Sequence, residues 1–327
     1  MRRRGLLIVA VAAALLAACS PAKKADTAAS GRTAIRFATD WRAQAEHGGF
    51  YEALATGEYA KRGLDVTIVQ GGPAVNVPQL LAAGAVEMGM GSNSFIVMNL
   101  AQEQAPVKAV AAFMQKDPQV LIAHPDQGVK SLADMKGRPI LISDAAVTTF
   151  WPWLKATFGF TDAQVRKYTH NNATFLADPR AIQEGYATSE PYTLEKEGHI
   201  QPQVFLLADS GYPGYAAMAL ATDKLIGAHP AAVQAFVEAS AVGWKAYLYG
   251  DPKLADALIL KDNPDMTPDV LDQARAKMRE SGIVAADGSG AMTDARWAEA
   301  FKVAVDAGVY PAAMDYKRGY TLQFLAK

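Results

Sequence analysis

Hydrophobic positions between residues 33 and 113 follow strand patterns and helical patterns in turn. Apolar runs of strand length, alternating or continuous, are separated by stretches with helical spacing. They predict strands at 33–38, 64–69, 86–90 and 107–113, and helices at 49–61, 77–83 and 95–104. Strands that alternate with helices in this way indicate an α/β fold with a mostly parallel sheet.

The same rhythm begins again after Asp117-Pro118. Strands are predicted at 120–123, 139–142, 165–168 and 204–207, and helices at 131–135, 149–158, 181–185 and 191–197. From Pro230 the chain is almost wholly helical, with helices expected at 230–249, 253–261, 268–281 and 294–307. The pattern therefore predicts two α/β units followed by a helical C-terminal region.

The second unit is inserted between the first unit and its closing helices. We expect lobe I to comprise residues 33–114 and 210–327, and lobe II to comprise residues 115–209. Two chain crossings between lobes permit a hinge that closes around a ligand. In open α/β sheets, ligands bind outside the carboxyl ends of the strands, so candidate contacts are expected in the loops that follow them.

The first 32 residues predict export and attachment to a membrane. Three arginines precede a short uncharged run, which describes a secretory signal over residues 1–18. Small residues directly before Cys19 resemble a bacterial lipobox, and this implies cleavage before Cys19 and lipidation of its thiol. Residues 19–32 lack large apolar side chains and are expected to form a flexible tether. The membrane is therefore an expected partner, through the lipid anchor.

Composition excludes several classes of function. The net charge is −1 and half of the residues are hydrophobic, so nothing indicates a nucleic-acid surface. Cys19 is the only cysteine, which leaves the mature chain without a disulfide, a thiolate metal site or a cysteine nucleophile. The five histidines are dispersed, and no nucleophile elbow, phosphate loop or dinucleotide fingerprint is present. We expect no metal, no cofactor and no catalysis.

Several motifs in order resemble a known family. They are Asp40-Trp41, His47-Gly48-Gly49-Phe50-Tyr51, Tyr59 with Gly63-Leu64-Asp65-Val66, Gly84 with Glu87-Met88-Gly89, Trp151-Pro152-Trp153, and Ser189-Glu190-Pro191-Tyr192. Together they resemble the substrate-binding proteins of ABC importers in the NMT/THI-like family, which is related to the fungal thiamine-pyrimidine synthase. Receptors for sulfonates, taurine and nitrate are wider relatives.

The resemblance implies a periplasmic-binding-protein type II fold, with two lobes around one ligand site. It also implies delivery of a small molecule to a permease and an ATPase, from the bacterial periplasm or cell surface. The fungal synthase carries a cysteine-rich motif that the mature chain here lacks, so the resemblance favours binding over synthase chemistry.

Aromatic residues in two places could stack on a flat ligand. Asp40 and Trp41 come directly after the first predicted strand, on the side expected to face the ligand. Stacking of a base on an aromatic ring contributes about 1–3 kcal/mol. Trp151 and Trp153 lie two residues apart near a helix start, so only one of them should reach the ligand, and Trp151 is preferred. The alternative is packing in the lobe interface for Trp41 and packing in the core for Trp151 and Trp153.

Glu190 is the most informative charged residue, since it stands where a short helix should begin. Its carboxylate could accept hydrogen bonds from an aminopyrimidine edge. The resemblance implies that a glutamate–tyrosine pair meets the pyrimidine, and here the pair would be Glu190 with Tyr192 or Tyr186. The alternative is a carboxylate that only stabilises the helix N-terminus.

Two further polar residues are candidates. Asn93 follows the third predicted strand and could read a polar ligand edge or cap the next helix. His47, beside Gly48-Gly49, could hydrogen-bond a ligand or serve as a capping or packing group.

The favoured interpretation is a lipoprotein receptor of an ABC importer that closes on a flat nitrogenous heterocycle, with a thiamine-precursor pyrimidine as first choice. One alternative keeps the receptor role but changes the ligand to riboflavin or an organic sulfonate. Another is a synthase-like enzyme that holds a pyridoxal-type cofactor on Lys61.

Overall fold

The computed structural model of the chain describes residues 31–326. The predicted signal peptide, Cys19 and nearly all of the predicted tether lie outside this range. Among the helices that the structure describes, none is both long and apolar enough to cross a membrane.

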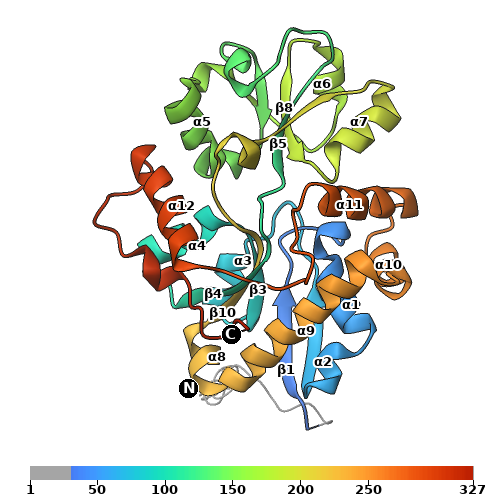
Figure 1. Cartoon of the computed structure of the whole chain (residues 1–327), viewed down its shortest axis with the longest axis vertical. Coiled ribbons are helices and arrows are strands. Elements are labelled where there is room, and N and C mark those ends of the chain that lie inside the picture. Colours follow the sequence, from blue (N-terminus) through green and yellow to red (C-terminus); the bar gives the residue numbers. More distant parts are fainter. Residues whose placement is uncertain (1–30, 327) are drawn as a thin grey trace, which may run out of the picture.

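Two five-stranded sheets form the centres of two lobes (Figure 1). In strand order, the sheet of lobe I contains β2 (Leu64–Val69), β1 (Thr33–Ala38), β3 (Met88–Asn93), β10 (Ala216–Thr222) and β4 (Val107–Met114). The sheet of lobe II contains β7 (Val165–Lys167), β6 (Ile140–Ile142), β8 (Ile182–Tyr186), β5 (Gln119–Ala123) and β9 (Gln203–Leu206).

The prediction of a mostly parallel sheet is confirmed for four of the five strands of each sheet, which run in one direction, but it did not identify one reversed strand in each. Strand β10 runs antiparallel to β3 and β4, and β5 runs antiparallel to β8 and β9. The connection explains the direction of β10. The chain leaves lobe I after Met114 and re-enters it at Ala216, which is directly paired with Met114. A strand that starts beside the end of its neighbour must run the opposite way.

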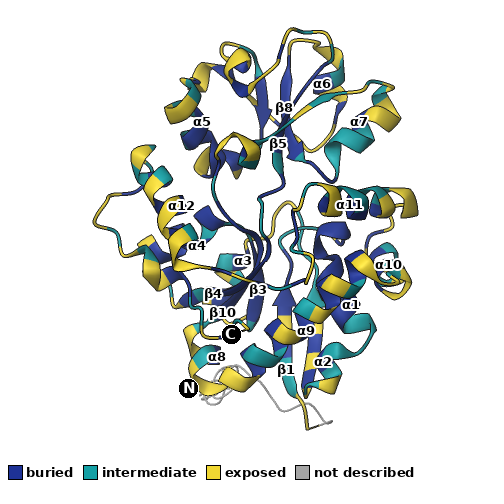
Figure 2. Cartoon of the chain, in the orientation of Figure 1, coloured by how far each residue is buried: buried dark blue, intermediate teal, exposed yellow. Residues whose placement is uncertain are grey.

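The helices cover the faces of the sheets (Figure 2). Those of lobe I are α1 (Gly48–Ala55), α2 (Glu58–Lys61), α3 (Val77–Ala82), α4 (Ser94–Gln102), α8 (Asp223–Ala228), α9 (Pro230–Tyr249), α10 (Lys253–Asp262), α11 (Pro268–Glu280) and α12 (Asp294–Asp306). Those of lobe II are α5 (Phe150–Phe158), α6 (Ala173–Ala177) and α7 (Glu190–Gly198). Short 3₁₀ turns include η1 (Ala45–His47) and η5 (Leu207–Ser210).

Two local predictions differ from the structure. The helix expected over 49–61 is interrupted at Gly57, whose φ of 72° belongs to the left-handed region that glycine adopts without a Cβ clash. Residues 181–185 were expected to be helical, yet 182–186 form strand β8 at the centre of the sheet of lobe II. Strand β8 is covered on both faces, so its sequence shows no alternation.

The chain passes between the sheets twice, between Met114 and Gln119 and again between Leu206 and Ala216. We propose that the lobes divide at these crossings. The guanidinium of Arg296 donates hydrogen bonds to the carbonyl oxygen of Gln115 in the first crossing and to that of Gly214 in the second, which ties both crossing segments to α12.

Close packing of α1 against α9 sets the position of the loop that precedes α1. A Cβ on Gly243 of α9 would lie 2.1 Å from the carbonyl oxygen of Gly49, so the two backbones are too close for any side chain between them. The result is that η1, with Glu46 and His47, is held against a rigid helix pair.

Candidate functional site

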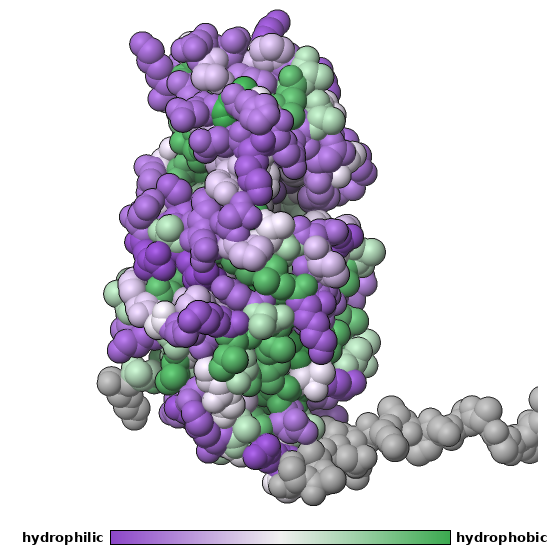
Figure 3. Space-filling model, turned by 90° about the vertical axis from the view of Figure 1, so that its right-hand side faces the viewer, coloured by the Kyte–Doolittle hydropathy of each residue, from purple (hydrophilic) through white to green (hydrophobic). Residues whose placement is uncertain are grey.

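The predicted contacts lie mainly where strands of both sheets end toward the other lobe, and the surface is hollowed between the two lobes (Figure 3). We call this the interlobe site. Its members come from the loops after β1, β7 and β8, from η1, from the end of β3, from β8 and from the start of α7. They are Asp40, Trp41, Glu46, His47, Ser92, Tyr168, His170, Glu184, Tyr186, Thr188 and Glu190.

On the side of lobe I, Asp40 organises two neighbours. Its Oδ1 lies 3.1 Å from Nε2 of His47, and its Oδ2 accepts a hydrogen bond from the hydroxyl of Ser92. Burial raises the pKa of Asp40, but the hydrogen bonds from His47 and Ser92 outweigh it and hold the pKa below its ordinary value. Asp40 and His47, both predicted from the sequence, therefore lie together as a hydrogen-bonded pair.

Glu46 joins the lobes. Its side chain is buried, and Oε1 accepts a hydrogen bond from the hydroxyl of Thr188 in lobe II. Burial raises the pKa of Glu46, and the carboxylate of Asp40 adds to this effect. Sequence reasoning missed both residues, since nothing in the local pattern marks a contact over 142 positions.

An aromatic contact also crosses between the lobes. The ring of Trp41 lies 4.9 Å from that of His170, and His170 lies 5.1 Å from Tyr168, all as centroid distances. Trp41 is half-buried, and His170 and Tyr168 follow β7 in lobe II. The predicted stacking residue of lobe I thus faces aromatic partners that the sequence did not indicate.

Glu190 begins α7 and folds back onto β8. Its Oε2 accepts the backbone N–H of Tyr186 at 2.7 Å. Gly185 permits this approach, because a Cβ there would lie 2.7 Å from Cβ of Glu190. Burial raises the pKa of Glu190 to about 7, with a smaller contribution from the neighbouring charge of Glu46. Tyr186, at the end of β8, lies among Asp117, Asp40, Glu46 and Glu190, and burial and these charges raise the pKa of its phenol.

Glu184 is a residue of the site that the sequence did not single out. It lies two positions before Tyr186 in β8, so both side chains are on one face of the strand. Burial raises the pKa of Glu184 to about 7, although Ser143 donates a hydrogen bond to it. Had 182–186 been recognised as a strand, the spacing of Glu184 and Tyr186 would have revealed their shared face.

The other predicted residues have structural roles. Asn93 caps α4, because its Oδ1 accepts the backbone N–H groups of Phe95 and Ile96. Trp151 was expected to stack on the ligand, and this was wrong: its ring is fully buried in lobe II and its indole N–H donates to Asp162 at 2.8 Å. Trp153 is buried as well, against Tyr212.

Tyr192 reaches lobe I and does not meet Glu190's carboxylate as a pair. Its hydroxyl donates to Oδ2 of Asp269 at 2.7 Å, and Nζ of Lys196 lies 2.8 Å from the same oxygen. These contacts join α7 to α11, which lies beneath it in Figure 1. Hydrogen bonds from Lys196 and Tyr192 hold the pKa of Asp269 well below its ordinary value. We call these three residues the interlobe latch.

Replacing Asp269 with asparagine is expected to loosen the latch. All three side chains lie at the surface, so the loss of the latch should weaken ligand binding by less than about fivefold. This effect on affinity should become smaller at high salt, which screens exposed charges. Small-angle X-ray scattering of the liganded protein should show a larger radius of gyration, because the latch acts when the lobes are together. Asp265→Asn is the control, because Asp265 pairs with Arg42 inside lobe I. Equal scattering curves for Asp269→Asn and the parent protein would contradict a latch.

Positive charges near the site are few among residues 31–326. Arg42 is 52% exposed and pairs with Asp265, and Lys61 is 62% exposed and pairs with Glu58 on α2. Lys61 therefore does not line the interlobe site. In the same range, no group of three or more histidine, cysteine or acidic side chains has an arrangement suited to a metal ion.

Comparison with solved structures establishes the fold. The putative periplasmic sulfonate-binding protein SsuA of a sulfonate ABC transporter from Methylobacillus flagellatus is 16% identical with a TM-score of 0.62, over 90% of this chain and 92% of that one. A Candida albicans gene product with the generic periplasmic-binding-protein fold is 13% identical with a TM-score of 0.64, over 90% and 98%. The desulfurization enzyme DSZB is 12% identical with a TM-score of 0.56, over 89% and 97%.

These likenesses confirm the expected periplasmic-binding-protein type II architecture with two α/β lobes. No curated protein sequence matches the chain. A family model does match, over residues 44–255, which include η1, the whole of lobe II and α9. The chain belongs to the NMT1/THI5-like family.

Proposed function

We propose that this protein is the solute receptor of an ABC importer and that it closes two lobes on a flat nitrogenous heterocycle. The observation that carries the proposal is the set of contacts between the lobes: Glu46 with Thr188, and Trp41 with His170. Side chains from both lobes would surround a ligand held at this place, so closure and recognition would be one event. The chain would deliver its ligand to a permease and an ATPase.

A thiamine-precursor pyrimidine suits the chemistry of the site. Trp41 and His170 would offer aromatic faces to its ring, and the carboxyl of Glu190 would meet its amino edge. Membership of the NMT1/THI5-like family supports this choice, since the motifs of the chain resemble a family related to the fungal thiamine-pyrimidine synthase. Riboflavin remains the alternative for a larger flat ring, since stacking does not distinguish heterocycles.

An organic sulfonate is the other alternative, and the SsuA protein of similar fold supports it. A sulfonate needs cationic partners, whereas the interlobe site holds Asp40, Glu46, Glu184 and Glu190. Carboxylates that already repel each other would repel a sulfonate as well. The site therefore favours a ligand with N–H donors over an anion.

A synthase-like enzyme is the least supported function. It would require Lys61 to hold a cofactor at the ligand site, yet Lys61 is a surface residue of α2 paired with Glu58. DSZB shows that the fold also occurs in an enzyme, so the fold by itself does not decide this point. We propose a binding protein, exported and attached through Cys19 to a membrane at the periplasm or cell surface.

Small molecules released from protein purified without refolding should identify the ligand class. Mass spectrometry is expected to find a pyrimidine, and calorimetry with 4-amino-5-hydroxymethyl-2-methylpyrimidine should then measure its affinity. Release of a sulfonate, together with tighter binding of an alkanesulfonate than of the pyrimidine, would contradict the proposal.

Glu190→Gln is expected to weaken binding of that ligand by about 1–3 kcal/mol, since it removes a charge-assisted hydrogen bond. The fold should survive, because the amide oxygen of glutamine can still accept the N–H of Tyr186. Calorimetry measures the affinity and circular dichroism the folding. Glu195→Gln, at an exposed position of the same helix, is the matched control. Unchanged affinity in Glu190→Gln would remove Glu190 from the site.

A further inference from the structure

Glu184 has a carboxylate oxygen that nothing in the described chain satisfies. The residue is 6% exposed, and its Oε2 is fully buried without a hydrogen-bond partner among residues 31–326. Buried acceptors almost always have a donor, so an orphaned one at a site between two lobes marks a place for a ligand's donor. His47 repeats the pattern in lobe I: it is 1% exposed and its Nδ1 has no partner in the same range.

The groups that face Glu184 are negative or neutral. Glu190, at the start of α7, raises the pKa of Glu184 in addition to burial. The phenol of Tyr168, after β7, feels the charges of Glu190, Glu184 and Glu197, and Ser143, after β6, is a neutral donor. No element packed here contributes an ammonium or guanidinium group to balance these carboxyls within the described range.

Lobe I adds more negative charge from the opposite side. Tyr186 lies on the same face of β8 as Glu184. Burial raises the pKa of its phenol, and the charges of Asp117, Asp40, Glu46 and Glu190 add to this effect. The positive partner that acts on Asp40 and Glu46 is His47, a single imidazole. Closing the lobes therefore concentrates carboxyls from both sides, and this is costly unless they take up protons or a positive charge enters with the ligand.

We propose, on the basis of the receptor function above, that the ligand is an organic cation whose ammonium or amidinium group donates to Glu184 and Glu190. A charged N–H donor satisfies the orphaned Oε2 and offsets the repulsion between the two carboxyls. A neutral ring would satisfy the hydrogen bond alone. The cationic group is thus the feature that selects the ligand. The aromatic faces of Trp41 and His170 stack on the flat ring to which that group is attached.

The direction of the pH dependence separates a cation from a neutral ligand. Burial raises the pKa of Glu184 and of Glu190 to about 7 without ligand. A bound cation favours their ionised forms and lowers both pKa values, so binding releases protons and the affinity falls as pH drops below about 7. A neutral ligand that accepts a hydrogen bond from a protonated carboxyl would bind more weakly as pH rises.

Two pairs of probes, each matched in shape, test the proposal on the full mature chain. The first is 4-amino-5-aminomethyl-2-methylpyrimidine, a cation near neutral pH, against its neutral 5-hydroxymethyl analogue. The second is benzamidinium against benzamide. Calorimetry at pH 8 should find the cation of a pair bound at least about tenfold more tightly. The preference should shrink at pH 6, and titrations in two buffers of different ionisation enthalpy should show proton release.

Glu184→Gln should abolish the preference for the cation. Should this variant fail to fold, proton release by the unaltered protein remains a decisive readout. Equal or tighter binding of the neutral member in every pair that binds, or no binding of either cation, would overturn the inference. Tighter binding of the neutral pyrimidine than of its aminomethyl analogue would overturn it while leaving the receptor function intact. Binding of benzamidinium but of neither pyrimidine would support a cationic ligand and contradict the proposal that the ligand is a pyrimidine.

Discussion

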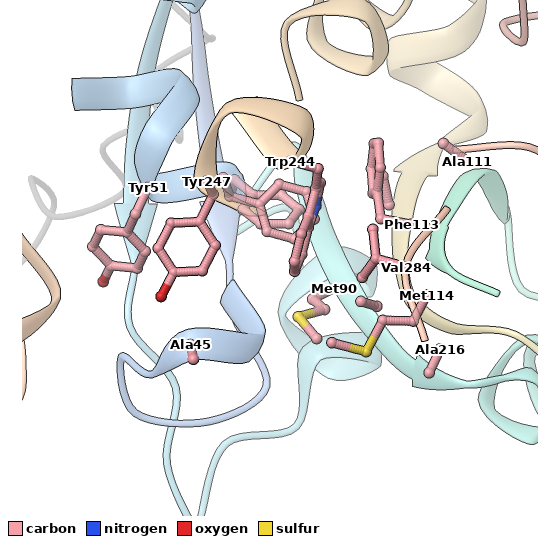
Figure 4. Close-up of a cluster of buried hydrophobic side chains, with 14 of the residues drawn as sticks. Ala45, Tyr51, Met90, Ala111, Phe113, Met114, Ala216, Trp244, Tyr247 and Val284 are labelled. Carbon is pink, nitrogen blue, oxygen red and sulfur yellow. The ribbon is translucent and has the colours of Figure 1, made fainter. Parts of the chain in front are cut away.

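Phe50→Ala is expected to lower the free energy of unfolding by about 3–5 kcal/mol, because it opens a cavity that the surrounding rings cannot refill. Phe50 is fully buried in α1. Its ring centroid lies 4.6 Å from that of Phe37, 5.3 Å from Phe113 and 5.8 Å from Trp244. Figure 4 shows Phe113 and Trp244 side by side in this cluster. Strand β1, strand β4 and helix α9 thus meet around one side chain.

Chemical denaturation monitored by tryptophan fluorescence measures the loss. Leu254→Ala is the control, since Leu254 is 57% exposed on α10 and its truncation should change stability by less than about 0.5 kcal/mol. A similar, small change for both variants would mean that the lobe I cluster relaxes around the missing ring. Since α1 follows η1, Phe50→Ala should also reduce ligand affinity by displacing Glu46 and His47.

Thr188→Val is expected to weaken ligand binding by about 1–3 kcal/mol while leaving the stability of the ligand-free protein nearly unchanged. Valine has the shape of threonine but no hydroxyl, so closure of the lobes would bury Oε1 of Glu46 without a donor. This penalty exists only when the lobes are together. It should therefore appear in the affinity and in the radius of gyration of the liganded protein, both of which report closure.

Thr148→Val provides the comparison for Thr188→Val. Thr148 is an exposed threonine of lobe II whose hydroxyl donates to the carbonyl oxygen of Ala145 three residues earlier. Its replacement should leave calorimetric affinities unaltered. Full affinity in Thr188→Val would show that the Glu46–Thr188 contact does not govern closure. It would contradict the proposal that closure at this contact and ligand recognition are one event.

Many elements could be predicted from the sequence because a local pattern encodes them. Helix α9 lies at residues 230–249, as its apolar spacing and initial proline indicate, and β1 and β2 occupy the predicted residues 33–38 and 64–69. The prediction failed at β8 and did not identify β10, which lie inside their sheets. The sequence of β10, Ala-Ala-Met-Ala-Leu-Ala-Thr, has no alternation because six of its seven residues are buried.

The candidate site was predictable to the extent that its residues follow strand ends. Asp40, Trp41, His47, Tyr186 and Glu190 all lie at the interlobe site. Trp151 was misplaced because helical spacing tells which residues share a face, not which face is buried. Tyr192 was misplaced because its partner across the lobes, Asp269, lies 77 residues away. Local spacing does not reveal such a contact.

The sequence by itself determined the alternation of strands and helices, the two units, the family and the chemical types available for a ligand. These follow from short-range periodicity and from motifs of adjacent residues, which need no knowledge of distant partners. Only the tertiary structure decided that Glu46 meets Thr188, that Trp41 meets His170, and that Glu184 is buried with an unsatisfied oxygen. Such pairings depend on how the two sheets face each other, and burial then shifts the pKa of each carboxyl that they bring together.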